Sequence, residues 1–152
     1  MIKVGDQLPV FELQNQNGDI IQSEKFLGKK LIIFFYPKAN TPTCTVEACN
    51  LNDHFSALEK QGFQLVGISA DTVKRQKNFH EKYGFRYDIL SDENHEVLEK
   101  FGVWQEKKNY GRTYMGIVRT TFVFDDKGIC TNVINQVKSK IAAEQILEQS
   151  KL

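Results

Sequence analysis

The sequence of 152 residues predicts one α/β domain built on a central mixed β-sheet with helices on both faces. Three observations favour this class: strand-length apolar runs alternate with helical patterns, hairpin turn signals occur near both ends, and no linker or repeat interrupts the chain. Strands that alternate with helices form parallel sheets with right-handed crossovers, and hairpins add antiparallel strands. A chain of this length buries about 70% of its unfolded surface, which is enough for one core.

The first third of the chain predicts an N-terminal hairpin followed by a central strand. Residues 10–13 and the segment from Ile20 onward are expected to pair, because Asn17-Gly18 between them supplies positions that tolerate positive φ. Residues 30–36 (KLIIFFY) form a continuous apolar run rich in β-branched and aromatic residues. Such a run is typical of a strand covered on both faces.

The middle of the chain alternates helical and strand patterns. Apolar residues recur every three or four positions from Ala48 to Leu58, which indicates an amphipathic helix. Capping residues precede the helices and glycines follow them. The expected elements, in order, are a helix over 43–60, a strand over 63–69 (FQLVGIS), a helix from Asp71 or Thr72 to Tyr83, a strand over 87–90 and a short helix ending at Phe101.

The last third predicts a loop, a second hairpin and a closing helix. Residues 104–116 (WQEKKNYGRTYMG) have the composition of an exposed loop. Residues 119–124 and 130–137 flank Asp125-Asp126-Lys127-Gly128, which is a hairpin signal. Residues 138–152 predict an amphipathic helix. Pattern alone establishes the fold class and leaves several α/β folds open.

Composition excludes several classes of partner. Twenty basic and nineteen acidic residues give a net charge of +1, which does not indicate a nucleic-acid or membrane partner. The longest apolar run, residues 31–36, is far shorter than the ~20 residues that span a bilayer. The N-terminus has no apolar stretch of signal-peptide length, so we expect a cytoplasmic location, where thiols stay reduced. The histidines and cysteines show no ligand spacing, so no metal site and no cofactor are expected.

The segment that carries chemistry is PKANTPTCTVEAC, residues 37–49. A buried strand ends at Pro37, and Cys44 falls in the first turn of the following helix, at the sheet edge where α/β proteins place their sites. Free N–H groups and the positive end of the helix dipole stabilise a thiolate at such a position. Thr41, three residues earlier, could donate to the sulfur. The alternative is that Cys44 is a small buried apolar residue, as most free cysteines are.

Cys49 lies five residues further along the same predicted helix. This spacing corresponds to an axial rise of about 7.5 Å, and a disulfide needs Cα atoms within roughly 7 Å. A disulfide between Cys44 and Cys49 therefore requires the start of the helix to unwind. The alternative is that Cys49 is an unrelated core residue.

The same segment resembles the active-site pattern of the peroxiredoxins, Pro-x-x-x-Thr-x-x-Cys, matched here by Pro37, Thr41 and Cys44. The longer stretch YPKANTPTCTVEAC is similar to the bacterioferritin-comigratory or Q-type subfamily, and so are VGDQLPVFEL, GISADT, SDEN and GRTYMGIVRTTFVFDDKG. The similarity covers nearly the whole chain. Thr43 is a departure, because the subfamily usually has glycine before the cysteine.

The resemblance implies a thioredoxin-like fold over residues 1–152 and specific roles for five residues. It implies that Cys44 is the peroxidatic cysteine, that Cys49 resolves it as an intramolecular disulfide, and that Arg119 lies beside the reactive sulfur. Pro37 and Thr41 complete the implied site. Without the resemblance, Arg119 would be interpreted as a surface residue at a strand end.

The implied activity is a thiol-dependent peroxidase that reduces hydrogen peroxide and organic hydroperoxides. The resemblance implies recycling by thioredoxin, with glutaredoxin as an alternative. It also implies a monomer, with a dimer as the alternative. Two other interpretations remain open: a redox sensor and a thiol–disulfide oxidoreductase. The latter class uses Cys-x-x-Cys, which this sequence lacks.

Overall fold

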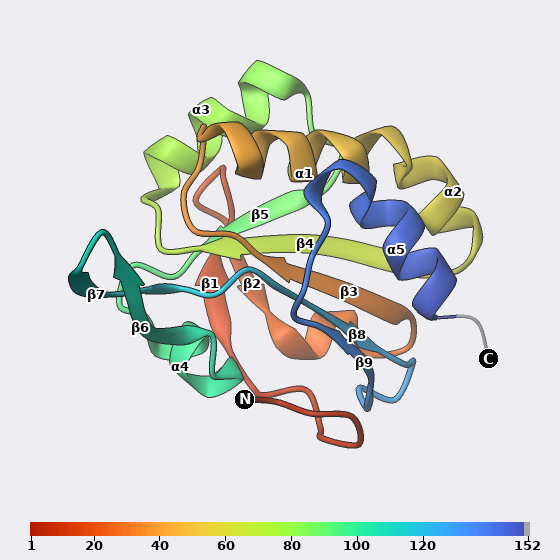
Figure 1. Cartoon of the computed structure of the whole chain (residues 1–152). Coiled ribbons are helices and arrows are strands. Elements are labelled where there is room, and N and C mark those ends of the chain that lie inside the picture. Colours follow the sequence, from red (N-terminus) through yellow and green to blue (C-terminus); the bar gives the residue numbers. More distant parts are fainter. Residues whose placement is uncertain (151–152) are drawn as a thin grey trace.

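The computed structural model describes residues 1–150 and places a seven-stranded mixed sheet at the centre of the molecule (Figure 1). The strand order is β2-β1-β5-β4-β3-β8-β9, and β6 and β7 form a separate two-stranded sheet. The strands are β1 (Glu12–Gln14), β2 (Ile20–Gln22), β3 (Lys30–Phe35), β4 (Phe63–Ser69), β5 (Asp88–Ser91), β6 (Trp104–Asn109), β7 (Arg112–Ile117), β8 (Thr120–Phe124) and β9 (Cys130–Ile134).

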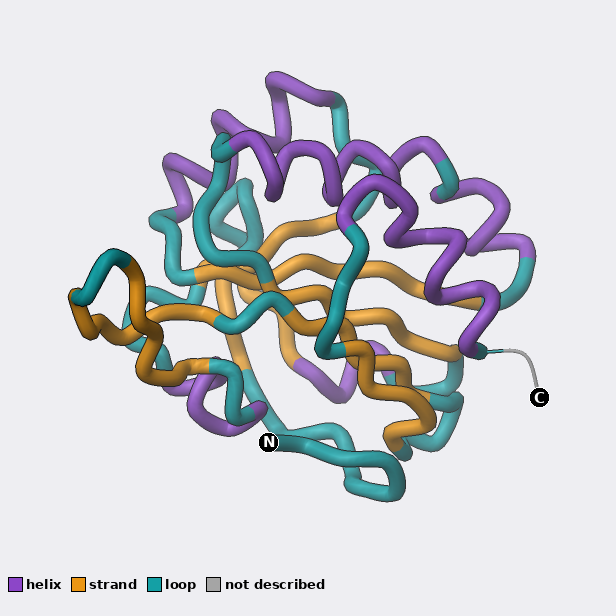
Figure 2. The backbone as a smooth tube through the Cα atoms, viewed as in Figure 1, coloured by secondary structure: helices purple, strands orange, loops and turns teal. Residues whose placement is uncertain are grey.

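The helices cover both faces of this sheet, as the sequence predicts (Figure 2). Helices α1, α2, α3 and α5 lie on one face, whereas α4 lies on the other (Figure 1). The helices are η1 (Ser23–Phe26), α1 (Pro42–Asp53), α2 (Phe55–Lys60), α3 (Val73–Tyr83), α4 (Glu96–Phe101), η2 (Ser139–Ile141) and α5 (Ala142–Gln149). No helix among residues 1–150 is both long and apolar enough to cross a membrane.

The predicted central strand is β3. It pairs with β4 in parallel and with β8 in antiparallel orientation. From Leu31 onward all of its residues are buried, because each face of the sheet packs against its own apolar cluster. Ile32 and Phe34 belong to the cluster under α1 and α3, and Ile33 and Phe35 belong to the cluster over α4. This two-sided burial explains the continuous apolar run of the sequence.

Both predicted hairpins of the main sheet are confirmed. Strands β1 and β2 pair in antiparallel orientation across a turn in which Gly18 has φ 81°. Strands β8 and β9 pair across Asp125, whose carboxylate accepts backbone N–H groups of Lys127 and Ile129. The first strand begins two residues later than the predicted residues 10–13, at Glu12.

The single helix predicted over residues 43–60 is wrong in one respect, because it is two helices that meet at His54. The His54 ring nitrogen Nδ1 lies 2.9 Å from the Asn50 carbonyl oxygen, and Nε2 lies 3.1 Å from Glu144 of α5. This side chain competes for a helix carbonyl and links the junction to another element. A pattern of apolar residues cannot reveal such a break, since the stripe continues into α2.

The loop predicted over residues 104–116 is also wrong, because this segment forms the β6–β7 hairpin that projects at the left of Figure 1. Tyr110 and Gly111, with φ 52° and 75°, form a two-residue turn in which both φ values are positive. Turns of this kind match the twist of paired strands. Most side chains of the hairpin are exposed, and Tyr110 is 97% exposed, so the burial pattern that marks other strands is missing here.

The closing helix predicted over residues 138–152 is shorter than expected and begins with a 3₁₀ turn, η2, before α5. Residues 151–152 of this prediction lie outside the described residues. Ala142, Ala143 and Ile146 are buried against the same cluster as α1. Helix α5 therefore packs beside the helix that carries Cys44 and Cys49.

Candidate active site

Helix α1 places Cys44 in its first turn, directly after the loop that leaves β3. Thr41 has extended backbone angles and precedes the helix, and Pro42 occupies its first position, where a missing N–H costs nothing. Cys44 is 2% exposed and belongs to the core cluster on this face of the sheet. The sulfur therefore lies near the start of a helix and largely out of water.

Arg119 reaches the same sulfur from the opposite end of the sequence. It directly precedes β8, and the antiparallel pairing of Phe35 with Thr120 puts that position next to the end of β3. Its guanidinium nitrogen Nη2 donates to Cys44 Sγ at 3.1 Å, and Nη1 donates to Glu47 Oε1 at 2.6 Å. The expected arrangement of Arg119 beside Cys44 is thus present in the geometry.

One guanidinium consequently faces two groups that can each carry negative charge. Burial opposes the charge on Arg119, but Glu47 and Cys44 outweigh this effect and raise the pKa of Arg119 above its ordinary value. The Arg119 side chain is only 18% exposed, and Glu47 is fully buried, so their contact is weakly screened by water.

The surroundings of Glu47 oppose the negative charge of its carboxyl group. Burial raises its pKa to about 7, although Arg119 acts in the opposite direction. Among residues 1–150, its second oxygen, Oε2, is buried without a hydrogen-bond partner. An ionised carboxylate in this position is costly to bury, and a proton on Oε2 removes part of that cost.

We expect this carboxyl group to make stability depend on pH. A carboxyl whose folded pKa is raised from 4.5 to about 7 contributes stability that is full below the unfolded value and lost as the pH rises through the folded value. Relative to Glu47→Gln, the native protein should therefore lose on the order of 3 kcal/mol of unfolding free energy between about pH 5 and pH 8. Urea denaturation of both reduced proteins across this range measures the difference, and a difference independent of pH would contradict the assignment.

Thr41 and Pro37 both lie between β3 and α1, and the recorded bond of the Thr41 hydroxyl is not to the sulfur. Its hydroxyl donates to the Lys38 carbonyl oxygen at 2.7 Å and closes the loop before the helix. Pro37 is half-buried, two residues after the end of β3. In this conformation Thr41 shapes the loop, and Arg119 is the side chain that contacts Cys44 Sγ.

Cys49 lies on the same helix as Cys44 and is half-buried, and both thiols are free. Burial raises the pKa of the Cys49 thiol, and the nearby carboxylate of Asp53 acts in the same direction. Both effects favour the protonated thiol of Cys49. Five residues separate the two cysteines on the continuous helix α1, so the folded form keeps their sulfurs from bonding.

The sequence does not predict the buried polar network that lies beside the loop between β3 and α1. Asp71 accepts a hydrogen bond from the Ala39 backbone N–H at 2.8 Å and another from the Ser69 hydroxyl at 2.6 Å. Gln76 accepts from the Tyr36 hydroxyl at 2.6 Å and donates to Ser69 at 2.9 Å. This network ties the loop before α1 to the end of β4 and to α3. Asp71 was predicted only as a possible helix cap, whereas Thr72 caps α3 by accepting from Arg75 N–H.

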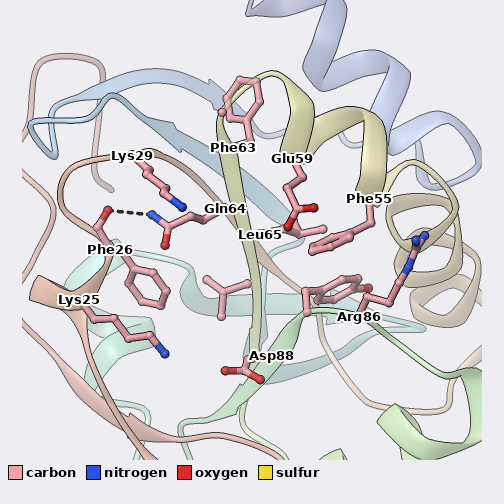
Figure 3. Close-up of a pocket in the computed structure, with 13 residues that line it drawn as sticks. Lys25, Phe26, Lys29, Phe55, Glu59, Phe63, Gln64, Leu65, Arg86 and Asp88 are labelled. Atoms are coloured by element: carbon pink, nitrogen blue, oxygen red, sulfur yellow. Dashed lines mark hydrogen bonds between the residues drawn. The ribbon is translucent and has the colours of Figure 1, made fainter.

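One cleft of the molecule lies away from this sulfur. A cleft of about 520 Å³ surrounds the start of β4, with Phe55 and Arg86 on one side of the strand and Phe26 and Lys29 on the other (Figure 3). No cysteine lines it. A smaller cleft of about 180 Å³ lies beside the first turn of α1, lined by Pro42, Thr43, Val46, Ser139 and Lys140.

A thioredoxin-like sheet with a cysteine at the first turn of a helix and an arginine on its sulfur defines the class of thiol peroxidases known as peroxiredoxins. The chain belongs to the AhpC/TSA family, whose model matches residues 4–133.

Individual relatives agree with this assignment. "Peroxiredoxin Bcp" of Escherichia coli is 42% identical over 138 residues, which cover 91% of this chain and 88% of that protein. A "putative peroxiredoxin bcp" of Haemophilus influenzae is 43% identical over 147 residues, which cover 97% of this chain and 95% of that protein. The structure of the bacterioferritin comigratory protein of Xanthomonas campestris, studied for alkyl peroxide reduction, has a TM-score of 0.87 at 31% identity and covers 94% of this chain and 96% of its own. The predicted thioredoxin-like fold and the predicted class are therefore confirmed.

Proposed function

We propose that this protein reduces hydrogen peroxide and organic hydroperoxides through Cys44, that Cys49 resolves the product, and that a thioredoxin-type dithiol protein restores both thiols. The observation that carries this proposal is the hydrogen bond of 3.1 Å from Arg119 Nη2 to Cys44 Sγ at the start of α1. A guanidinium bonded to a sulfur in the first turn of a helix is the kind of electropositive setting in which cysteines act as nucleophiles.

In the first step the Cys44 thiolate attacks one peroxide oxygen. The S–O bond forms as the O–O bond breaks, and the distal oxygen leaves with a proton as water or an alcohol. Arg119 stabilises the negative charge that develops on the leaving oxygen, which is electrostatic catalysis by a group already in place. Cys44 becomes a sulfenic acid.

In the second step the start of α1 unwinds and the Cys49 thiol attacks the sulfenic sulfur. The S–S bond forms, the S–O bond breaks, and the hydroxyl leaves as water with the thiol proton. The disulfide is then reduced by exchange with a dithiol protein, which is oxidised in turn. Thioredoxin is the proposed reductant, with glutaredoxin as the alternative.

Pro37 and Thr41 are proposed as positioning residues of this site. Pro37 ends the strand and shields the sulfur from water, and the Thr41 hydroxyl holds the loop by its bond to Lys38. Once peroxide enters, the same hydroxyl can turn toward the bound oxygen. The apolar side chains of Pro42 and Val46 in the neighbouring small cleft suit the alkyl group of an organic hydroperoxide.

We propose that residues 1–152 act as one peroxiredoxin domain, as a monomer, in the cytoplasm. A reducing compartment suits a chain with three free cysteines, because it keeps them as thiols between cycles. A dimer is the alternative that measurement of mass in solution would reveal.

Replacement of Cys49 tests the resolving step. Cys49→Ser should still consume a single equivalent of peroxide at the native rate, because Cys44 and Arg119 are unchanged. Steady-state turnover with thioredoxin and its reductase should stop, because the sulfenic acid has no partner on the chain. Stopped-flow peroxide consumption and coupled turnover measure the two effects separately.

Cys130→Ser serves as the matched control, because Cys130 is buried in β9 and has no place in the proposed chemistry. This variant should keep both the first step and the turnover. Unchanged cycling in Cys49→Ser would mean that another residue resolves the sulfenic acid. A native protein that stalls after one oxidation in the presence of thioredoxin would favour the redox sensor.

A further inference from the structure

The two halves of helix α1 are held to the rest of the molecule very unequally. This matters for the proposed function, on which the present inference rests, because Cys44 and Cys49 can bond only if part of the helix opens. The hydrogen bonds of the α1 side chains indicate which part of the helix opens.

The second half of α1 is clamped to two other elements. Asn50 donates from Nδ2 to the Lys140 carbonyl oxygen at 3.0 Å and accepts the Ala143 N–H at Oδ1 at 2.8 Å. Asn52 accepts the Arg86 N–H at 2.9 Å and donates to the Gly84 carbonyl oxygen at 3.3 Å. Each asparagine thus bonds to backbone groups of a segment remote in sequence, which fixes the turn just after Cys49.

The side chains of the first turns of α1 are held by hydrogen bonds from one residue, Arg119, at the reactive sulfur. Arg119 holds Cys44 and Glu47, and the first turn contains no acidic residue that would complement the helix dipole. When Cys44 becomes a sulfenic acid, its charge-assisted bond to Arg119 is weakened. Oxidation therefore loosens the half of the helix that carries Cys44.

Tyr87 lies at the boundary between the two halves. Its hydroxyl donates to the Ala48 carbonyl oxygen at 2.7 Å, on the peptide that leads into Cys49. Tyr87 is buried, and its ring contacts Phe85 and Phe34 at centroid distances of 5.3 Å and 5.8 Å. It directly precedes β5, so it is anchored to the sheet and does not move with α1.

We propose that the Tyr87 hydroxyl is a latch on the opening of α1, and that it sets how fast Cys49 captures the sulfenic acid of Cys44. Unwinding as far as residue 48 breaks its bond to the helix and leaves a buried hydroxyl unpaired, which is unfavourable. In the folded helix the latch keeps Cys44 in the geometry that reacts with peroxide. Tyr87 is a positioning residue that acts through the helix and touches neither cysteine sulfur.

The latch sets a competition between two fates of the sulfenic acid. In one, the Cys49 thiol displaces the hydroxyl, which forms the disulfide and water. In the other, a second peroxide transfers an oxygen to Cys44, which becomes a sulfinic acid as the peroxide is reduced to water or an alcohol. A slower opening leaves more time for the second reaction.

Tyr87→Phe removes the hydroxyl and keeps the ring. Ala48 then has no side-chain bond to lose, so disulfide formation after one equivalent of hydrogen peroxide should accelerate roughly three- to tenfold. The rate of the first oxidation should stay within about twofold of native, and the sulfinic fraction of Cys44 in excess peroxide should fall in proportion. Rapid mixing, alkylation of free thiols and mass spectrometry measure all three quantities.

Tyr83→Phe is the matched control, because Tyr83 packs in the same aromatic cluster and its hydroxyl makes no hydrogen bond within residues 1–150. It should leave the rates and the sulfinic fraction at native values. A disulfide rate in Tyr87→Phe equal to native would overturn the latch while the proposed function stands. An absence of oxidation at Cys44 in every variant would instead overturn the proposed function.

Amide hydrogen exchange of the native protein provides a second test that needs no variant. In the disulfide form, the amides of residues 45–52 should lose protection, because in the helix they donate to the carbonyl groups of residues 41–48. The His54 amide should keep its protection, because its acceptor is the carbonyl of Asn50, in the part of α1 that Asn50 and Asn52 hold. Loss of protection at His54 as well would overturn the boundary on which the latch depends.

Discussion

Replacing Cys44 with serine is expected to reduce peroxide turnover to the uncatalysed background. Serine preserves the shape of the side chain, but its hydroxyl does not ionise near neutral pH and is a poor nucleophile toward peroxide oxygen. Arg119 would keep its contact with Glu47, so the surrounding site should stay assembled. Turnover with thioredoxin and its reductase, at matched protein concentration, measures the loss.

The result requires evidence that the variant is folded, which circular dichroism and thermal unfolding provide. Cys130→Ser is the appropriate comparison, because it makes the same atomic change at another buried cysteine. Appreciable turnover in Cys44→Ser, together with loss of turnover in Cys130→Ser, would mean that the wrong cysteine has been identified.

The second large effect is expected for Arg119→Ala. Its guanidinium is bonded to the sulfur and is placed to meet the leaving oxygen, and loss of one such preorganised donor typically costs on the order of 100- to 1,000-fold in rate. The second-order rate constant of the first oxidation should fall by this amount. Single-turnover stopped-flow measurement isolates that step from resolution and recycling.

Loss of Arg119 also leaves the buried Glu47 carboxyl group without the donor that bonds to Oε1, which is a structural cost separate from catalysis. The same substitution in a Glu47→Gln background removes that complication. The rate should remain low in the double variant, and Arg119→Lys should recover only part of it, because an ammonium cannot bond to Cys44 and Glu47 in the same fork geometry. A rate within about threefold of native in Arg119→Ala would remove this residue from the reaction.

The sequence is most informative where a strand or a helix end has a local signature. The run over residues 30–36 became β3, and the glycines at 84 and 102 end α3 and α4 in the left-handed conformation. The strand depends on burial in the apolar core, and the helix ends depend on the backbone freedom of glycine. The β6–β7 hairpin has little such burial, so the sequence around its turn residues Tyr110 and Gly111 has the polar composition of a loop.

The active-site residues also differ in whether a local pattern predicts them. Cys44 and Pro37 could be placed from a motif within one short segment. The approach of Arg119 depends on the antiparallel pairing of β8 with β3, and the sequence resemblance alone indicated it. Asp71, Asn50 and Tyr87 were not identified, because each holds the loop or α1 through a contact with segments far away in sequence. Such contacts have no local signature.

The identity of the residue that peroxide oxidises first tests the account most directly. Reduced protein is titrated with less than one equivalent of hydrogen peroxide, free thiols are alkylated, and peptides are mapped by mass spectrometry. We expect a Cys44–Cys49 disulfide in the native protein, a sulfenic acid at Cys44 in Cys49→Ser, and an unmodified Cys130. Peroxide that is consumed while Cys44 remains a free thiol would contradict it.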